Sequence, residues 1–190
     1  VILGYTTSSL ERVAVEEPVH EALNQIHFAA ERSADLTRQL LAFSRRQMYQ
    51  PEVLNLNSLL EQQSKMLSRL IGEDVQLQFV PGEDLGNIRM DPSQVDQIMV
   101  NLVINARDAM PEGGRLVIRT GHDRKTGRIW LRITDAGVGI SDRDLPHIFE
   151  PFFTTKNEGS GVGLGLSMVY GIIREHKGEI SVESAEGEGT

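Results

Sequence analysis

The sequence contains no cysteine, so disulfide bonds and thiolate metal sites are excluded. Basic residues are also scarce: 19 Lys and Arg stand against 27 Asp and Glu, and the net charge is −8 at pH 7. That balance argues against a general nucleic-acid or anionic-membrane partner, because both bind basic surfaces. No apolar run approaches the roughly 18–20 residues that span a bilayer. The opening VILGYTTSSL lacks the basic start and cleavage site of a signal peptide, so we expect neither a membrane span nor a leader.

What the sequence does contain is the composition of a folded soluble protein, with 39% hydrophobic and 24% charged residues. Its 190 residues are enough for one domain with a buried core and one additional element. The opening VILGYTTSSL and the final AEGEGT both look internal to a longer chain, so we expect a fragment.

The N-terminal quarter of the chain has a helical pattern. After Pro18, apolar or small residues recur every three or four positions to about Met48, which predicts one long helix. Residues 1–14 are expected to form an antiparallel partner, with a turn at residues 16–18. We predict a helical hairpin that pairs with a second copy into a four-helix bundle; the alternative is a hairpin packed on its own globular domain.

Gln50-Pro51 has the pattern of a linker, so we predict two domains: the helical hairpin of residues 1–50 and a second domain of residues 51–190. The second part mixes helical and strand patterns and predicts an α+β fold: an α/β sandwich of a mixed sheet with about three helices on one face. The expected helices are Asn57–Ile71 with Asn57 as N-cap and Gly72 as stop, Pro92–Met110 with Asp91 as N-cap and Gln94 at the third position, and Leu164–His176 closed by Gly178. The expected strands are Val75–Val80, Gly86–Met90, Arg115–Thr120, Arg128–Thr134 after a turn at Gly127, and Glu179–Ser184.

Three polar residues share a face of the helix that precedes Met110. Asn101, Asn105 and Asp108 are spaced by four and three, beside an apolar stripe formed by Val95, Ile98, Met99, Leu102, Ala106 and Ala109. Asparagine is a weak helix former, because its amide competes for backbone hydrogen bonds. Asn101 and Asn105 therefore cost helix stability, and this helix alone leaves two interpretations open: a binding role, or side chains that are solvated or cap a loop.

Two glycine-rich stretches follow. DAGVGI comes directly after a strand, where Asp135 could accept a hydrogen bond from an exocyclic amine and the glycines let a ligand approach the backbone; the alternative is a simple turn. GSGVGLGL leads into a helix and could offer backbone N–H groups to phosphates, with Lys156 just upstream; the alternative is a flexible linker. Neither stretch has the Rossmann or P-loop spacing.

The order NLVINARDAM, DAGVGI, IFEPFFTTK and GSGVGLGLS resembles the N, G1, F and G2 boxes of sensor histidine kinases. Their ATP-binding fold is shared with type II topoisomerases, some heat-shock chaperones and mismatch-repair ATPases. The segment DLTRQLLAFSRR resembles the second helix of the kinase dimerisation domain, and LIGEDVQL resembles the start of the ATP-binding domain. The resemblance covers nearly the whole chain.

The resemblance implies that Asn105 holds Mg²⁺ against the phosphates of ATP, a role that suits an amide oxygen. Asn101 stands where hydrolytic relatives carry a glutamate that activates water. Because an amide cannot accept a proton at neutral pH, this favours a transferase over an ATP hydrolase. Asp135 would bind the adenine amine, and Ile140 would pack on the ring.

Gly161, Gly163 and Gly165 would belong to a mobile lid over the phosphates. Phe149, Phe152 and Phe153 would anchor that lid, with plain core packing as the alternative. The remaining residues that the resemblance assigns to nucleotide binding are Asp108, Gly137, Gly139, Lys156, Val162 and Leu164. Two positions depart from the family pattern: Ala136 replaces the usual asparagine or threonine, and Val162 replaces a common threonine.

Kinases of this type carry their acceptor histidine shortly before an I-L-G-Y segment, so we expect it upstream of Val1 and predict no catalytic residue within the chain. None of the five histidines is expected to replace it: His20, His27, His122, His147 and His176. The resemblance further implies a homodimer, a response-regulator receiver domain as partner, no contact of this segment with nucleic acid or membrane, and a cytoplasmic location. A non-catalytic nucleotide-binding dimerisation module and a hydrolase of the same fold remain the alternatives.

Overall fold

The computed structural model describes residues 2–15, 19–30, 50–156 and 161–190. The chain divides into two compact units: Val1–Gln47 with Lys156–Gly161, and Met48–Thr155 with Val162–Thr190. Among the described residues, no helix is both long enough and apolar enough to cross a membrane.

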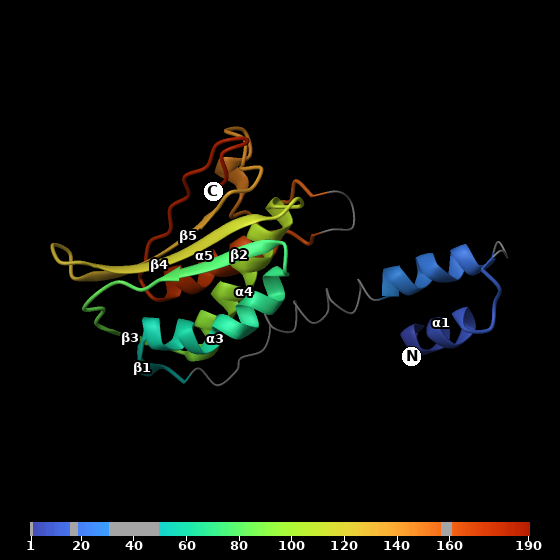
Figure 1. Cartoon of the computed structure of the whole chain (residues 1–190), viewed down its shortest axis with the longest axis horizontal. Helices are drawn as coiled ribbons and strands as arrows, with labels where there is room; N and C mark the ends of the chain where they lie inside the picture. Colours follow the sequence, from blue (N-terminus) through green and yellow to red (C-terminus); the bar gives the residue numbers. More distant parts are fainter. Residues whose placement is uncertain (1, 16–18, 31–49, 157–160) are drawn as a thin grey trace. The chain divides into compact units, whose positions relative to one another are not determined.

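The first unit contains two neighbouring helices, α1 (Ile2–Leu10) and a helical stretch at residues 19–30 (Figure 1). The buried hydroxyl of Thr6 is hydrogen-bonded to Nδ1 of His27 at 2.7 Å, which joins the two helices. The predicted helix pair is therefore confirmed where the chain is described. The predicted turn at residues 16–18 and the continuation of the second helix through residues 31–49 lie outside the described residues.

The second unit is built on a mixed three-stranded sheet in the order β2-β4-β5. β2 (Val75–Val80) runs parallel to β4 (Gly114–Asp123), and β4 runs antiparallel to β5 (Arg128–Asp135). A separate antiparallel pair joins β1 (Glu52–Asn55) to β3 (Asn87–Met90). The pattern of the sequence predicted the strands of the larger sheet, but it missed β1.

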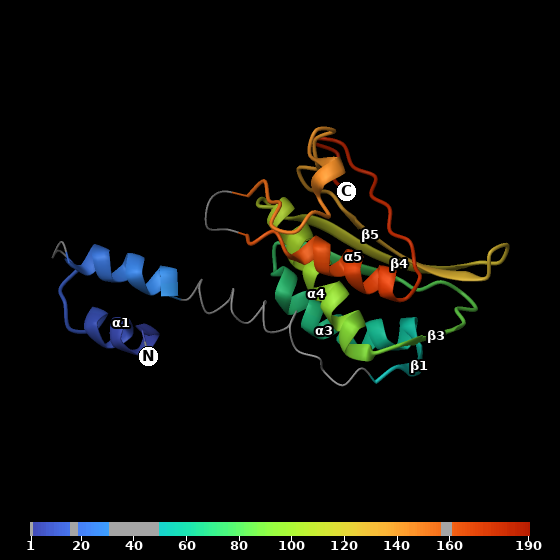
Figure 2. The ribbon, with the colours of Figure 1, turned by 180° about the vertical axis from the view of Figure 1, so that it is seen from behind.

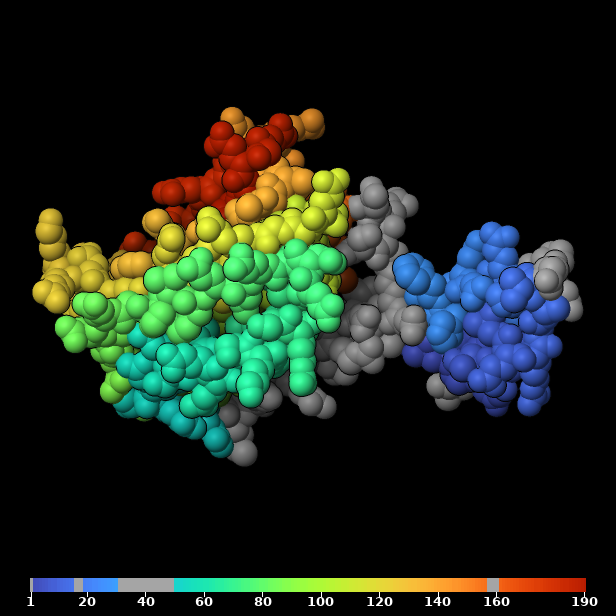
Figure 3. Space-filling model, viewed as in Figure 1, coloured from blue at the N-terminus to red at the C-terminus, as the bar shows by residue number. Residues whose placement is uncertain are grey.

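Three helices cover one face of the larger sheet: α3 (Leu56–Ile71), α4 (Pro92–Ala109) and α5 (Gly165–Glu175) (Figures 1 and 2). A short 3-10 helix, η1, spans Leu145–His147. Seen from the side of Figure 1, α3, β2 and β4 lie against one another across the surface of this unit (Figure 3). The predicted α+β architecture is confirmed.

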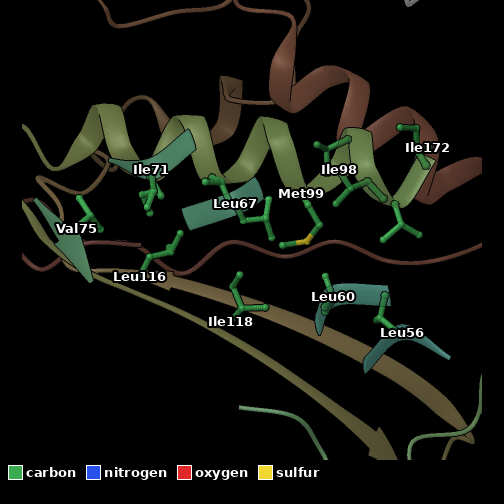
Figure 4. Close-up of a cluster of buried hydrophobic side chains, with 14 of the residues drawn as sticks. Leu56, Leu60, Leu67, Ile71, Val75, Ile98, Met99, Leu116, Ile118 and Ile172 are labelled. Carbon is green, nitrogen blue, oxygen red and sulfur yellow. The ribbon is translucent and has the colours of Figure 1, made fainter. Parts of the chain in front are cut away.

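The core lies between the helices and the sheet (Figure 4). α4 is central to it, because Val95, Met99 and Val103 are almost completely buried. Burying a side chain of this size contributes about 1.5–3 kcal/mol, so the helix layer is held mainly by this apolar seam. Its partners in Figure 4 come from α3, β2, β4 and α5: Leu56, Leu60, Leu67, Ile71, Val75, Leu116, Ile118 and Ile172.

Helix ends explain most of the boundaries. Asp91 caps α4 as predicted, with Oδ1 accepting the Ser93 N–H at 2.9 Å, and Gly72 ends α3 with a φ of 90°. The predicted N-cap Asn57 is wrong: Asn55 caps α3 by accepting the Ser58 N–H at 3.2 Å. Asn57 instead donates to the carbonyl of Gly82 at 3.0 Å, so its polar group serves a contact outside the helix.

The predicted strand Glu179–Ser184 is also wrong, because these residues join neither sheet. Exposure does alternate along the segment, and Ile180 packs against the core. Alternation requires only an extended chain with one face inward, whereas a strand also requires backbone pairing. A backbone hydrogen bond to β5 comes later in the chain, from the N–H of Asp135 to the carbonyl oxygen of Thr190 at 2.9 Å.

Candidate functional site

The two asparagines of α4 lie against the beginning of α5. Both are half-buried, and Asn101 Nδ2 donates to the carbonyl of Gln97 at 2.7 Å. A Cβ added to Gly165, the first residue of α5, would lie 3.0 Å from Asn101 Oδ1 and 3.7 Å from Asn105 Nδ2. Both amides therefore lie beside the N-terminus of the helix that follows the glycine-rich stretch, and neither side chain is fully solvated.

Asp108 lies one turn further along α4 and is bound to its neighbour. Arg107 donates to Asp108 Oδ1 from Nη2 at 2.8 Å, and its Nη1 donates to the carbonyl of Leu70 at 3.2 Å. The arginine thereby joins the last turn of α4 to the end of α3. Through Arg107, Asp108 therefore contributes to the contact between α4 and α3, in addition to the nucleotide-binding role predicted for it.

Asp135 is the last residue of β5 and is half-buried. Its Oδ1 accepts the N–H of Gly137 at 2.9 Å. Burial raises the pKa of Asp135, because it penalises the charged form more than the backbone hydrogen bond from Gly137 favours it. A carboxylate that is partly desolvated yet kept in place is suited to accept a hydrogen bond from a ligand.

The loop after Asp135 is packed closely on the end of α4. Val138 N–H donates to the carbonyl of Ala109 at 2.9 Å, and a Cβ on Gly137 would lie 2.6 Å from that same oxygen. Gly139 has a φ of 70°, and a Cβ there would lie 1.9 Å from the carbonyl oxygen of Ala185. Both glycines are thus required because the chain packs closely on itself at these positions. The interpretation of the sequence had explained them only by the approach of a ligand.

The C-terminal segment completes this loop, and the sequence did not assign it to the site. Ser184 Oγ accepts the N–H of Ile140 at 2.9 Å and donates to the carbonyl of Gly189 at 2.7 Å. Asp135 N–H donates to Thr190 O, and a Cβ on Gly189 would lie 2.2 Å from the carbonyl oxygen of Asp135. The available signal was the G-x-G-T sequence at the end of the chain, whose first and last residues are Gly187 and Thr190.

The glycine-rich stretch is described only from residue 161 onward. Gly163 has a φ of 70°, and its carbonyl accepts the N–H of Phe152 at 2.8 Å. The buried Leu164 precedes α5, and no side chain caps the N-terminus of that helix. The first-turn N–H groups of α5 thus have no side-chain cap, and a helix N-terminus of this kind suits an anion.

Lys156 and Gly161 are grouped with the first compact unit, so their approach to Asp135 and Asn105 stays a prediction. Val162 is half-buried and belongs to the second unit.

The three phenylalanines of the third motif differ in their surroundings. The ring of Phe149 contacts Tyr170 of α5 with centroids 5.3 Å apart, and Phe153 contacts His147 at 5.7 Å. Phe152 has a φ of 70° and is 67% exposed, so core packing does not explain it. The hydrogen bond from the Phe152 N–H to the Gly163 carbonyl joins this segment to the glycine-rich stretch.

Histidines and acidic residues do not form a metal site by themselves. Within the described parts of the chain, no three His, Asp or Glu residues are grouped closely enough to hold a metal ion. His147 is bound to Glu150 at 2.8 Å, and His176 Nε2 lies 2.7 Å from Gln94 Oε1. A cation here would depend on amide oxygen and on the oxygens of a bound ligand, a set that fits Mg²⁺.

Comparison with known proteins places this arrangement in a family. Residues 90–190 match the family described as histidine kinase-, DNA gyrase B-, and HSP90-like ATPase. The sensor kinase CckA of Brucella abortus is 45% identical over 187 residues, covering 92% of this chain and 20% of the relative. The sensor histidine kinase ZraS of Salmonella typhi is 32% identical over 189 residues, covering 99% of this chain and 40% of the relative.

A solved structure supports the fold. The crystal structure of full-length ShkA in complex with AMPPNP has a TM-score of 0.75 and 22% identity, and covers 99% of this chain and 40% of ShkA. The chain thus spans one fifth to two fifths of the proteins that it resembles. With the family model matched over residues 90–190, the chain belongs to the histidine kinase-, DNA gyrase B- and HSP90-like ATPases.

Proposed function

We propose that the chain is part of the catalytic core of a sensor histidine kinase in a two-component system. Residues 51–190 bind Mg-ATP, and residues 1–50 contribute a hairpin that dimerises with a second copy. The parent protein transfers the γ-phosphoryl group of ATP to a histidine upstream of Val1, and then to an aspartate of a response regulator. The kinase relatives that align along nearly the whole chain support this assignment.

One observation carries the proposal: α4 joins the three motifs. Its last turn accepts a hydrogen bond from Val138 in the Asp135 loop, and its middle lies against Gly165 at the start of α5. An acceptor for a base, amide ligands and free helix N–H groups are therefore held around one rigid element. Phosphoryl transfer depends mainly on such positioning and on charge stabilisation.

In this proposal each motif has one task. Asp135 accepts a hydrogen bond from the adenine amine, and Ile140 packs on the ring. The residues that surround the phosphates are Asp108, Gly137, Gly139, Lys156, Gly161, Val162, Gly163, Leu164 and Gly165. Asn105 would hold Mg²⁺, which would supply positive charge against the phosphates. Asn101 cannot remove a proton from water, so the γ-phosphoryl group is preserved for the protein acceptor.

The first test uses γ-labelled ATP with two proteins: this chain, and a version extended upstream through the expected histidine. Acid-labile label on the extended version alone supports the proposal. Label on the present chain would mean that His20, His27 or another residue is the acceptor. Absence of label on both would favour the nucleotide-binding module.

Asn105→Ala supplies the matched test of binding, with the exposed β3 residue Asn87→Ala as control. The first variant is expected to lose Mg-dependent nucleotide binding, and the second to retain it.

A further inference from the structure

The chain enters the second unit at a small two-stranded ribbon, formed by β1 and β3. Its register pairs Glu52 with Met90, so the segment that enters the unit lies beside the residues that lead into α4. We call residues 50–55 and 87–91 the entry ribbon. Because α3 begins directly after β1 and α4 directly after β3, the ribbon determines where both helices start.

Each helix of this pair is capped by a residue that makes a second hydrogen bond, to a residue in or next to the other half of the entry ribbon. Asn55 caps α3 and donates from Nδ2 to the carbonyl of Leu85 at 3.0 Å. Asp91 caps α4 through Oδ1 and accepts the backbone N–H of Gln50 on Oδ2 at 3.0 Å. The two caps are therefore also cross-links between the incoming chain and the start of the helices.

Asp91 is unusual among the charged residues of the described chain, because it is only 8% exposed. Its carboxylate also accepts the Ser93 hydroxyl at 2.7 Å. The N–H of Gln50, followed by the hydroxyl of Ser93, holds the pKa of Asp91 below its usual value. A buried carboxylate is costly unless each oxygen is hydrogen-bonded, and here one oxygen serves the helix and the other serves the incoming chain.

The geometry points to Asp91 as a positioning residue for phosphoryl transfer. It clamps the incoming chain at Gln50 to the N-terminus of the helix that carries Asn101 and Asn105. The clamp fixes the backbone at Gln50, where the chain enters the ATP-binding unit, and a change at this point alters how the bound γ-phosphoryl group is presented to its acceptor. Displacement of a reacting group by about 1 Å can lower a rate about 100-fold, so a small rotation at this junction is sufficient. This role rests on the proposed kinase function.

Asp91→Asn separates the clamp from the cap. Asparagine is as good an N-cap as aspartate, so Oδ1 still accepts the Ser93 N–H. The second oxygen becomes an NH₂ group, which faces the Gln50 N–H as donor against donor and breaks the clamp. Asp123→Asn is the matched control, because Asp123 also accepts one backbone N–H, from Lys125 at 2.9 Å, and one hydroxyl, from Thr126 at 2.7 Å. Asp123 is the last residue of β4, next to the turn that leads into β5.

Three measurements are made on the extended protein: Gln50 amide exchange by NMR, Kd for Mg-AMPPNP, and the initial rate of histidine phosphorylation at saturating ATP. For Asp91→Asn we expect faster exchange at Gln50, preserved exchange protection along α4, and an unchanged Kd. The phosphorylation rate is expected to fall roughly tenfold, equivalent to about 1.4 kcal/mol. Asp123→Asn is expected to match the wild type in all three.

A second variant removes the other partner of the clamp. Gln50→Pro deletes the donor N–H, and the double variant Asp91→Asn/Gln50→Pro is expected to be no slower than the slower single variant, because both break one contact.

Three outcomes overturn the role of Asp91. An unchanged phosphorylation rate in Asp91→Asn shows that the clamp does not position the reaction. A parallel loss of Kd and α4 protection shows that Asp91 only stabilises the helix. Absence of phosphorylation in the wild-type extended protein overturns the proposed function itself. Equal phosphorylation of the wild type and Asp91→Asn overturns only the role of Asp91.

Discussion

Replacement of Asp135 by asparagine is the sharpest test of the nucleotide site, because ligand affinity and stability should change in opposite directions. The variant removes one negative charge and retains nearly the same shape. Its Oδ1 can still accept the Gly137 N–H that the wild-type carboxylate accepts at 2.9 Å. The loop between β5 and the end of α4 therefore has no reason to change its course.

The expected loss of affinity follows from the strength of one hydrogen bond to a charged acceptor. Such a bond contributes about 1.5–3 kcal/mol. If Asp135 accepts the adenine amine, Asp135→Asn should weaken Mg-AMPPNP binding by about 10- to 150-fold. Isothermal titration calorimetry near neutral pH measures this directly.

The expected change in stability has the opposite sign. Burial raises the pKa of Asp135 in the folded protein, so its contribution to stability is fully present below the unfolded pKa and is lost as the pH rises through the folded pKa. At neutral pH the ionised group is therefore destabilising in the ligand-free protein. Because the side chain is only half-buried, the gain from Asp135→Asn should be about 1 kcal/mol or less. That corresponds to a rise of at most about 2–4 °C in Tm.

The control is Asp123→Asn, at a carboxylate whose pKa is lowered by hydrogen bonds from Thr126 and Lys125. It should leave nucleotide affinity unchanged and lower stability at neutral pH, because stability from a lowered pKa is present above the unfolded pKa. Unchanged affinity in Asp135→Asn would refute the adenine assignment. A ligand-free variant less stable than the wild type would refute the reasoning from burial.

The remaining predictions concern α4 and its contacts. Asn105→Ala should abolish the dependence of nucleotide binding on Mg²⁺, measured by calorimetry with and without EDTA, and retained dependence would contradict the metal assignment. Gly165→Ala places a Cβ 3.0 Å from Asn101 Oδ1; the loss of about 0.5–1.5 kcal/mol from a disturbed hydrogen bond should nearly cancel the helix-propensity gain of up to about 1 kcal/mol. The unfolding free energy of Gly165→Ala should thus change little, while its affinity for Mg-AMPPNP should fall about tenfold or more. Unchanged affinity would show that Gly165 does not border the nucleotide site. Burial raises the pKa of Asp96, so Asp96→Asn should equal or exceed the wild type in urea unfolding at neutral pH, with an advantage that disappears in acid; a less stable variant at neutral pH would contradict this.

The reason for the last expectation lies in a buried polar pair between α3 and α4. Gln63 Nε2 donates to Asp96, while Gln63 Oε1 is buried and has no hydrogen-bond partner in the described structure. An asparagine at position 96 could donate to that oxygen after a rotation of the amide. Leaving a buried acceptor unpaired costs about 1–3 kcal/mol, so one substitution at this pair can raise the free energy of unfolding.

The sequence predicted those parts of the fold whose signals are local. The cap at Asp91, the stop at Gly72 and the alternation of Val75–Val80 each depend on a few neighbouring residues, and each is confirmed. β1 was missed because its four residues have no clear alternation and are ordered by pairing with β3, more than thirty positions away. The misassigned cap at Asn57 has the same origin, since its amide is occupied by a distant carbonyl.

The candidate site shows the same division. The motifs identified Asn101, Asn105 and Asp135, because their residue types are unusual for a helix interior and a strand end. The sequence did not show that Ser184 and Thr190 hold the loop after Asp135, since those contacts join residues about 44 to 55 positions apart. It also gave the glycines of that loop a ligand-binding reason, whereas Gly137 and Gly139 are already required by backbone packing.

The contacts of α4 explain how motifs so far apart in sequence can act together. Its N-terminus is held by Asp91 and the entry ribbon, its middle faces Gly165, and its last carbonyl, on Ala109, holds the Asp135 loop. A packed helix moves as a rigid body, so a displacement at one end is carried to the other contacts. A substitution within the Asp135 loop should therefore affect one task, whereas loss of the Asp91 clamp should change the placement of the whole site while leaving its internal geometry intact. That difference is why affinity for nucleotide and the rate of transfer must be measured separately in this protein.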